Sequence, residues 1–145
     1  MKKIFIYILI LMAIITIIIA INISNKNSVK KDISNFNFQY EMYKDKELQG
    51  TEVASIINKA IDNNEKNSVA KDKKGFYIEN DTTSVKIIVN FLNNNEKVQY
   101  PMETIEKVGM NDFIRNFNNV SFKVTEINYN SIGKVSKLIL EQIEK

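Results

Sequence analysis

The first strongly apolar stretch of the chain covers residues 4–23, with the sequence IFIYILILMAIITIIIAINI. It carries no charge, and nothing before Asn22 is more polar than Tyr7 or Thr16. Twenty residues of α-helix measure about 30 Å, the thickness of the hydrocarbon core of a bilayer. A core helix of a small soluble domain would show a polar stripe, which this stretch lacks. The pattern predicts a transmembrane anchor at residues 1–23 that contacts the lipid bilayer through residues 4–23.

The alternative to an uncleaved anchor is a cleaved signal peptide, because Met1, Lys2 and Lys3 form a positive start. However, the apolar run exceeds the usual length of about 7–15 residues for a signal sequence. It also lacks a small-x-small cleavage site, since Asn22 stands where a small residue is needed. Lysines flank both ends of the run, so the positive-inside rule is nearly balanced. The short segment before the run favours a cytoplasmic N-terminus, and we expect a signal-anchor with an extracytoplasmic soluble domain.

The pattern changes after the apolar run. Residues 24–37, SNKNSVKKDISNFN, are rich in Asn, Ser and Lys and show no apolar period, which is typical of a juxtamembrane linker. Residues 38–145 are enough for one soluble domain.

Two stretches of that domain have helical spacing. In residues 51–64 the apolar positions recur at i, i+3, i+4, i+7 and i+8, with Thr51 as a plausible N-cap and Asn63 and Asn64 at the end. A second helical stretch starts at Pro101 and is interrupted at Gly109. The residues spaced for one face of each helix are Val53, Ile56, Ile57, Ala60 and Ile61, and then Met110, Phe113, Ile114 and Phe117.

Alternation marks the strands. Within residues 84–92 one set of alternate positions is strongly apolar, and the set between them is Lys86, Ile88 and Asn90. We expect this strand to pair with residues 76–80 in a hairpin that turns at 81–83. Residues 120–125 alternate in the same way, and after turn residues at 129–134 the stretch 135–142 returns as a strand, with a helix as the alternative. The predicted fold class is α+β, with helix-hairpin-helix-hairpin order and a four-stranded antiparallel sheet covered by helices on one face.

Several short pieces of the chain stand out beside these elements: Gly50-Thr51, the stretch 56–59, GFYIEN at 75–80, the stretch 102–105 and the stretch 133–136. With these pieces the chain resembles an uncharacterised family of small single-pass membrane proteins from low-GC Gram-positive bacteria. The resemblance covers most of residues 36–142 and the N-terminal anchor. It implies the architecture and a bacterial origin, and it implies no activity.

Composition narrows the chemistry. The 145 residues include 20 Lys and Arg and 17 Asp and Glu, for a net charge of +3, which is too balanced for a nucleic-acid binder that works by bulk charge. There is no Cys and no His. Disulfides, thiolate nucleophiles, Ser-His catalysis and ordinary zinc sites are therefore excluded, and we expect no metal and no cofactor.

Carboxylates remain as candidates for acid–base catalysis, which needs one raised and one ordinary pKa in a shared cleft. Each candidate falls at a helix start, a turn or a polar face, where capping or solvation explains it. We therefore expect no catalytic residue. The candidates are Glu52, Asp62, Asp81, Glu103 and Asp112.

Other motifs are also weak. Residues 62–65 lack the glycine and the later glutamate of an EF-hand, and four glycines are few for a phosphate-cradling loop. The KDKK run at 71–74 is expected to be a solvated loop. Phe36, Phe38, Tyr40 and Tyr43 are expected to pack on the domain, with a lipid-interface or partner-contact role as the alternative.

These features together predict a non-enzymatic, membrane-anchored extracytoplasmic interaction module with a protein partner in the cell envelope. A subunit of a pilus-like or secretion assembly is one alternative, although no Gly-Phe-x-x-x-Glu processing site follows Met1, Lys2 and Lys3. A carboxylate-based enzyme acting on the cell wall is the other.

Overall fold

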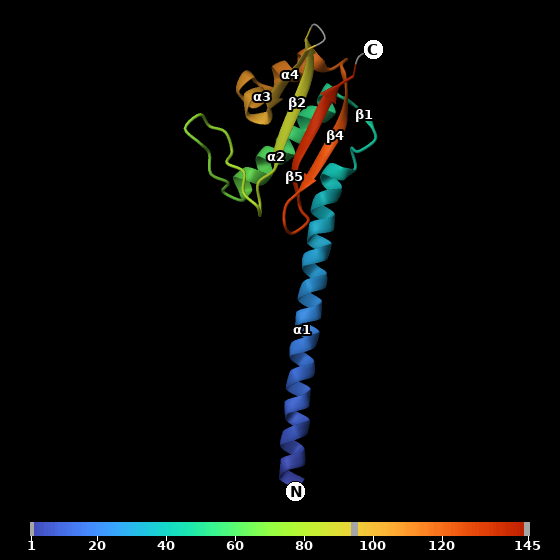
Figure 1. The fold of residues 1–145 in the computed structure, drawn as a ribbon, viewed down its shortest axis with the longest axis vertical. Coiled ribbons are helices and arrows are strands. Elements are labelled where there is room, and N and C mark those ends of the chain that lie inside the picture. The colour runs from blue at the N-terminus through green and yellow to red at the C-terminus, as the bar shows by residue number, and fades with distance from the viewer. Residues whose placement is uncertain (1, 94–95, 144–145) are drawn as a thin grey trace. The chain divides into compact units, whose positions relative to one another are not determined.

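The computed structural model describes residues 2–93 and 96–143 (Figure 1). The chain divides into two compact units, Met1–Asn35 and Phe36–Lys145. Helix α1 (Lys2–Glu41) forms the first unit, and its last turns belong to the second. The described part of the second unit contains three more helices and five strands.

In the first unit, the apolar side chains of α1 that the structure describes between Ile6 and Val29 are exposed; Ile15, for example, is 46% exposed and Tyr7 is 70% exposed. Within the described ranges, α1 is the one helix long and apolar enough to cross a membrane, judged by length and composition. An anchor and a signal sequence both meet this test. Residues 24–37, predicted to be a linker, continue the helix as far as Glu41. No Gly or Pro interrupts residues 24–41, and extending an existing helix avoids the cost of nucleation.

The second unit is built on a mixed sheet, which confirms the α+β class but not the predicted four antiparallel strands. The strand order is β1-β4-β5-β2-β3, and β2 and β5 run parallel while every other neighbouring pair is antiparallel. The strands are β1 (Glu47–Gln49), β2 (Lys86–Asn93), β3 (Glu96–Pro101), β4 (Ser121–Tyr129) and β5 (Val135–Gln142). In the parallel pair, Val89 lies opposite Leu140, so two alternating apolar faces share one core.

The prediction that residues 84–92 pair with residues 76–80 in a hairpin is wrong. Residues 76–80 form only an isolated bridge between Lys71 and Tyr77, and β2 pairs instead with β3. The predicted helix-hairpin-helix-hairpin order is therefore not confirmed in that form, and β1 also precedes the first helix of the sequence-based scheme. Residues 135–142 are a strand, as predicted, and not the alternative helix.

Helix α2 (Gly50–Lys66) buries the predicted apolar face against the sheet (Figure 1). Its N-cap is Gln49 and not Thr51, because the helix already begins at Gly50. It also continues past the predicted end, because Asn64 faces the core instead of capping the helix. The Asn64 amide donates to the Val85 carbonyl and accepts the Val85 N–H, both at 2.8 Å.

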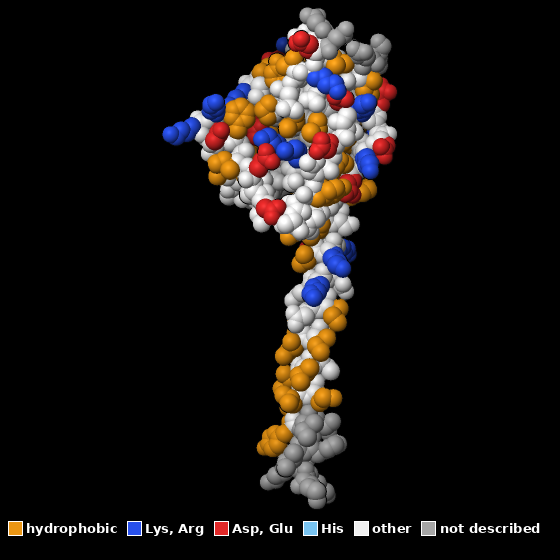
Figure 2. All heavy atoms as spheres, viewed as in Figure 1, with side chains coloured by type: hydrophobic (Ala, Val, Ile, Leu, Met, Phe, Trp, Pro, Cys, Tyr) orange, Lys and Arg blue, Asp and Glu red, His pale blue; other side chains and the backbone are white. Residues whose placement is uncertain are grey.

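The second helical stretch is split at Gly109, as predicted, into α3 (Met102–Val108) and α4 (Met110–Phe117). Gly109 has a φ of 111°, which glycine adopts readily and other residues do not. The helices pack on the sheet, and the hydrophobic core lies between them. On the face visible in Figure 2, positive and negative side chains are interspersed over the second unit, which we also call the folded unit.

Candidate functional site

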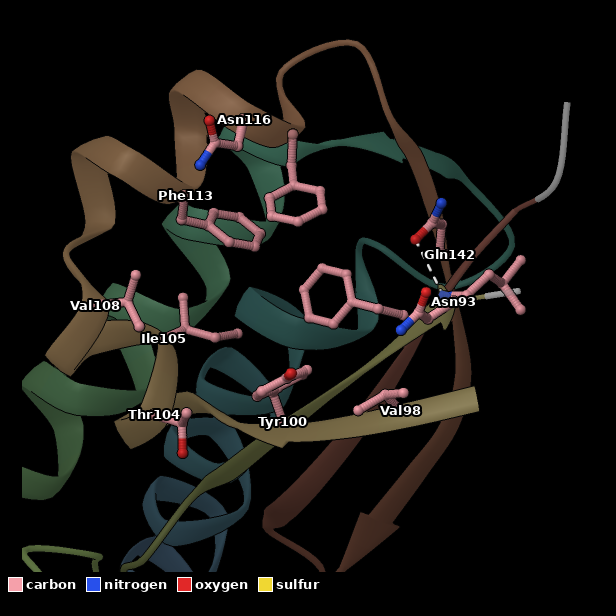
Figure 3. Close-up of a pocket in the computed structure, with 12 residues that line it drawn as sticks. Asn93, Val98, Tyr100, Thr104, Ile105, Val108, Phe113, Asn116 and Gln142 are labelled. Atoms are coloured by element: carbon pink, nitrogen blue, oxygen red, sulfur yellow. Dashed lines mark hydrogen bonds between the residues drawn. The ribbon is translucent and has the colours of Figure 1, made fainter. Parts of the chain in front are cut away.

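The second unit contains an apolar pocket of about 440 Å³ between the β2–β3 hairpin and helices α3 and α4 (Figure 3). None of the described residues that line it carries a formal charge, and four of them are aromatic. The lining residues are Phe91, Leu92, Asn93, Val98, Tyr100, Thr104, Ile105, Val108, Phe113, Asn116, Phe117 and Gln142. Its volume lies within the range of about 300–1,000 Å³ that is typical of ligand pockets.

Alternation along the hairpin and helical spacing along α4 together build the pocket wall. Phe91 of β2 packs against Tyr100 of β3 and Phe117 of α4, with ring-centroid distances of 5.4 Å and 4.8 Å. Phe113 and Phe117 are four residues apart on α4 and stack at 5.1 Å. In Figure 3, Val98 and Tyr100 project from β3 on the pocket side, across from Phe113.

Two tight backbone features place the helices around the pocket. Pro101 ends β3 and is the N-cap of α3, so the chain passes from strand to helix without a loop. Gly50 lies against α4: a Cβ at this position would stand 2.3 Å from the Phe117 carbonyl oxygen. The bare glycine therefore lets α2 and α4 approach closely enough for Phe117 to reach the pocket.

Two ion pairs lie on the elements that form the pocket. Lys97 of β3 forms an ion pair with Glu141 of β5, and Asp112 pairs with Arg115 at 2.8 Å on α4. At the rim, the Gln142 side chain accepts the Leu92 N–H at 3.2 Å. The pocket therefore suits an uncharged, largely apolar group.

The sequence provides only part of this site. Phe113 and Phe117 were predicted as one helix face, and the structure places both in the pocket wall. Val98 and Tyr100 were not predicted, because the short β3 stretch lies next to polar and charged residues. The alternation of Val98 and Tyr100 immediately before Pro101 is the signal that could have found them.

Four of the five candidate carboxylates have structural partners or lie in solvent, and the structure buries only Glu103 among the five. The Glu52 side chain accepts the Gln49 N–H at 2.8 Å at the start of α2, in the capping role expected of it. Asp62 is exposed on α2. Hydrogen bonds from Ser131 lower the pKa of Asp81, and Asp112 forms the ion pair with Arg115.

Glu103 is the exception to the expectation that these carboxylates cap or are solvated. It lies in the first turn of α3, as predicted, but it is only 1% exposed. Its Oε1 accepts the Tyr77 N–H at 3.0 Å, so the side chain ties α3 to the loop before β2. Its Oε2 has no hydrogen-bond partner among the described residues. Within the same residues, no group of three or more acidic side chains is arranged to hold a metal ion.

The KDKK run at 71–74 is exposed, as expected for a solvated loop. Asp72 organises it by accepting the N–H groups of Lys74 and Phe76 at 2.9 Å and 2.8 Å. These hydrogen bonds, that of Phe76 above all, lower the pKa of Asp72. The run is therefore an ordered turn whose carboxylate is already engaged.

The expected packing of the juxtamembrane aromatic residues holds for three of the four. Tyr40 and Tyr43 are buried, and Phe36 packs on Tyr40 with ring centroids 5.4 Å apart. Phe38 is 64% exposed and does not share this packing. Beside them, Asn37 donates to the Gly133 carbonyl and accepts the Val135 N–H, both at 2.8 Å, which joins the end of α1 to the β4–β5 hairpin.

A second, polar hollow of about 300 Å³ lies near the same hairpin and includes Glu79, Asp81 and Tyr129. The Tyr129 hydroxyl donates to Glu41 at 2.7 Å, and this hydrogen bond raises the pKa of Tyr129 to about 12. Glu79 forms an ion pair with Lys86 at 2.8 Å, which lowers the pKa of Glu79. The charges of this hollow are therefore largely satisfied within the chain.

The Tyr129 hydrogen bond makes a testable contribution to stability. We expect Tyr129→Phe to lower the free energy of unfolding by about 0.5 kcal/mol at pH 7, since the side chain is half exposed to water. The folded chain holds the phenol proton more tightly than the unfolded chain does. The contribution is therefore complete below about pH 10 and is lost as the pH rises towards 12. Urea titrations of both proteins at several pH values measure the difference, and a difference that does not shrink between pH 10 and 12 would contradict the assignment.

Comparison of this chain with protein-family models, curated proteins and solved structures finds no match.

Proposed function

We propose that this protein is a non-enzymatic interaction module, held in the bacterial cell membrane by the apolar part of α1, with its folded unit on the extracytoplasmic side and a protein partner in the cell envelope. The observation that carries the proposal is the continuity of α1. The helix that contains the apolar run of residues 4–23 also supplies Asn37 and Tyr40 to the interior of the folded unit.

A binding role is favoured over catalysis by the chemistry of the pocket. The described lining offers apolar and aromatic surface, amides and two hydroxyl groups, and no carboxylate, ammonium or guanidinium group. Aromatic side chains in an uncharged hollow are typical of the core of a protein–protein interface. A membrane location places such a surface where it meets other envelope proteins.

Site-specific photocrosslinking in intact cells tests the proposal. Benzoylphenylalanine is introduced at Val108 on the pocket rim, at Gln99 on β3, or at Ile132 in the β4–β5 turn, all of which are exposed. We expect the membrane-bound chain to form a discrete adduct with another protein from at least one of these positions. Adducts only between copies of this chain would instead favour a pilus-like assembly, and no adduct from any of the three positions would contradict the module.

A further inference from the structure

The free edge of the sheet lies beside the apolar pocket. β3 is the last strand in the order β1-β4-β5-β2-β3, and β2 is the one strand that pairs with it in the described part of the chain. An edge strand presents backbone N–H and C=O groups on its open side, and an extended peptide is the chemical partner that satisfies them.

The same strand forms one wall of the pocket. Val98 and Tyr100 of β3 both line it, and Tyr100 is 40% exposed. A strand added beside β3 would turn alternate side chains to the pocket side of the sheet, because side chains alternate between the two faces of a strand. The backbone edge and the pocket are therefore placed to act on one ligand.

The charges around the pocket define the side chain it accepts. The described lining is uncharged, and on the elements that form the pocket Lys97 and Arg115 make ion pairs with Glu141 and Asp112. An ionised side chain would lose its hydration without gaining a counter-ion. A large aliphatic or aromatic side chain matches the apolar walls instead.

Residues near both ends of β3 limit the length of the strand that can be added. Lys97 is exposed, and a lysine on an edge discourages indiscriminate strand pairing. Pro101 has no N–H to donate. Only the stretch 98–100 is free of both features, so the ligand strand is short.

We propose that β3 and the pocket bind a short extended peptide segment of a partner protein, which adds to the sheet beside β3 and places one large uncharged apolar side chain in the pocket. This inference rests on the proposed function, because it names the kind of partner that the module binds. It also names the recognition mode, in which backbone hydrogen bonds give affinity and the pocket gives specificity.

The test uses the full chain in lipid nanodiscs and a displayed library of random twelve-residue peptides as the probe. We expect the selected peptides to share one large apolar residue. We also expect the residues two positions before and after it, which lie on the same face of the peptide strand, to be uncharged. We expect Val108→Asp to weaken their binding by about tenfold or more, because it places a charge on the pocket rim. Ile132→Asp is the matched control, since it makes the same change at another exposed position, and we expect it to leave binding unchanged.

N-methylation of the selected peptide separates strand addition from simple pocket filling. In a strand that pairs on one side, every second backbone N–H points to the neighbouring strand and the ones between point away. Methylation of the peptide amides that point to β3 should therefore abolish binding. Methylation of the amides that point away from β3 should leave binding intact. Amide hydrogen exchange within residues 96–100 should also slow when the peptide is bound.

Several outcomes would overturn this inference. They are the absence of any enriched peptide, equal binding by the Val108→Asp variant and the wild type, tolerance of both methylated sets, and dimerisation of the chain through β3. Photocrosslinking keeps the two proposals distinguishable. A partner that crosslinks at Ile132 but not at Val108 or Gln99 leaves the module intact and overturns the peptide site.

Discussion

Asn64→Ala is expected to lower the free energy of unfolding by about 2–4 kcal/mol, because it leaves a buried backbone N–H and C=O without partners. Asn64 is fully buried, and its amide satisfies both groups of Val85 just before β2. The substitution removes both hydrogen bonds at once, so the start of β2 should be held less firmly to α2.

Urea unfolding of the full chain in detergent micelles measures this effect, with near-ultraviolet circular dichroism reporting the packing of the tyrosines. Asn58→Ala is the matched control, since Asn58 lies exposed on the same helix. It should change the free energy of unfolding by less than about 0.5 kcal/mol. Equal effects of the two substitutions would show that the Asn64 side chain does not hold β2.

Gly50→Ala is expected to destabilise the folded unit by about 2–3 kcal/mol, because it overpacks the contact between α2 and α4. The added Cβ would lie 2.3 Å from the Phe117 carbonyl oxygen, a backbone atom that moves only if α4 moves. The same displacement would carry Phe117 away from Phe91, so the pocket should change as well.

Thr51→Ala serves as the control for Gly50→Ala and also tests where α2 begins. Thr51 is exposed and lies inside the first turn, since Gln49 is the N-cap. We expect a loss below about 0.5 kcal/mol, whereas removing a true N-cap costs about 1 kcal/mol. Heat unfolding of both variants in micelles gives the comparison, and a larger loss for Thr51→Ala than for Gly50→Ala would contradict the assigned contact.

Local patterns predicted the elements that depend on nearby residues. The apolar face of α2 has helical spacing, β2, β4 and β5 alternate, and Gly109 separates α3 from α4, all of which is visible in the sequence. Such patterns record which side of an element is buried, so they also revealed Phe113 and Phe117.

Features that depend on distant residues were not predictable. The parallel pairing of β2 with β5 joins residues about fifty positions apart, and alternation alone does not say which strand lies beside which. Asn37 and Asn64 looked like linker and helix-end residues, and only the fold gives their amides backbone partners. The pocket combines four elements with one residue at the end of β5, and no single stretch of sequence encodes it.

The most direct test of the central proposal is the intact mass of the chain recovered from carbonate-washed membranes of a Gram-positive host, before and after protease treatment of intact cells. We predict a chain of all 145 residues in the membrane pellet before treatment, and loss of the folded unit, residues 36–145, when protease is added outside the cells. A chain that lacks its first two dozen residues and is recovered in the aqueous fraction, or a full-length chain that the protease does not reach, would contradict it.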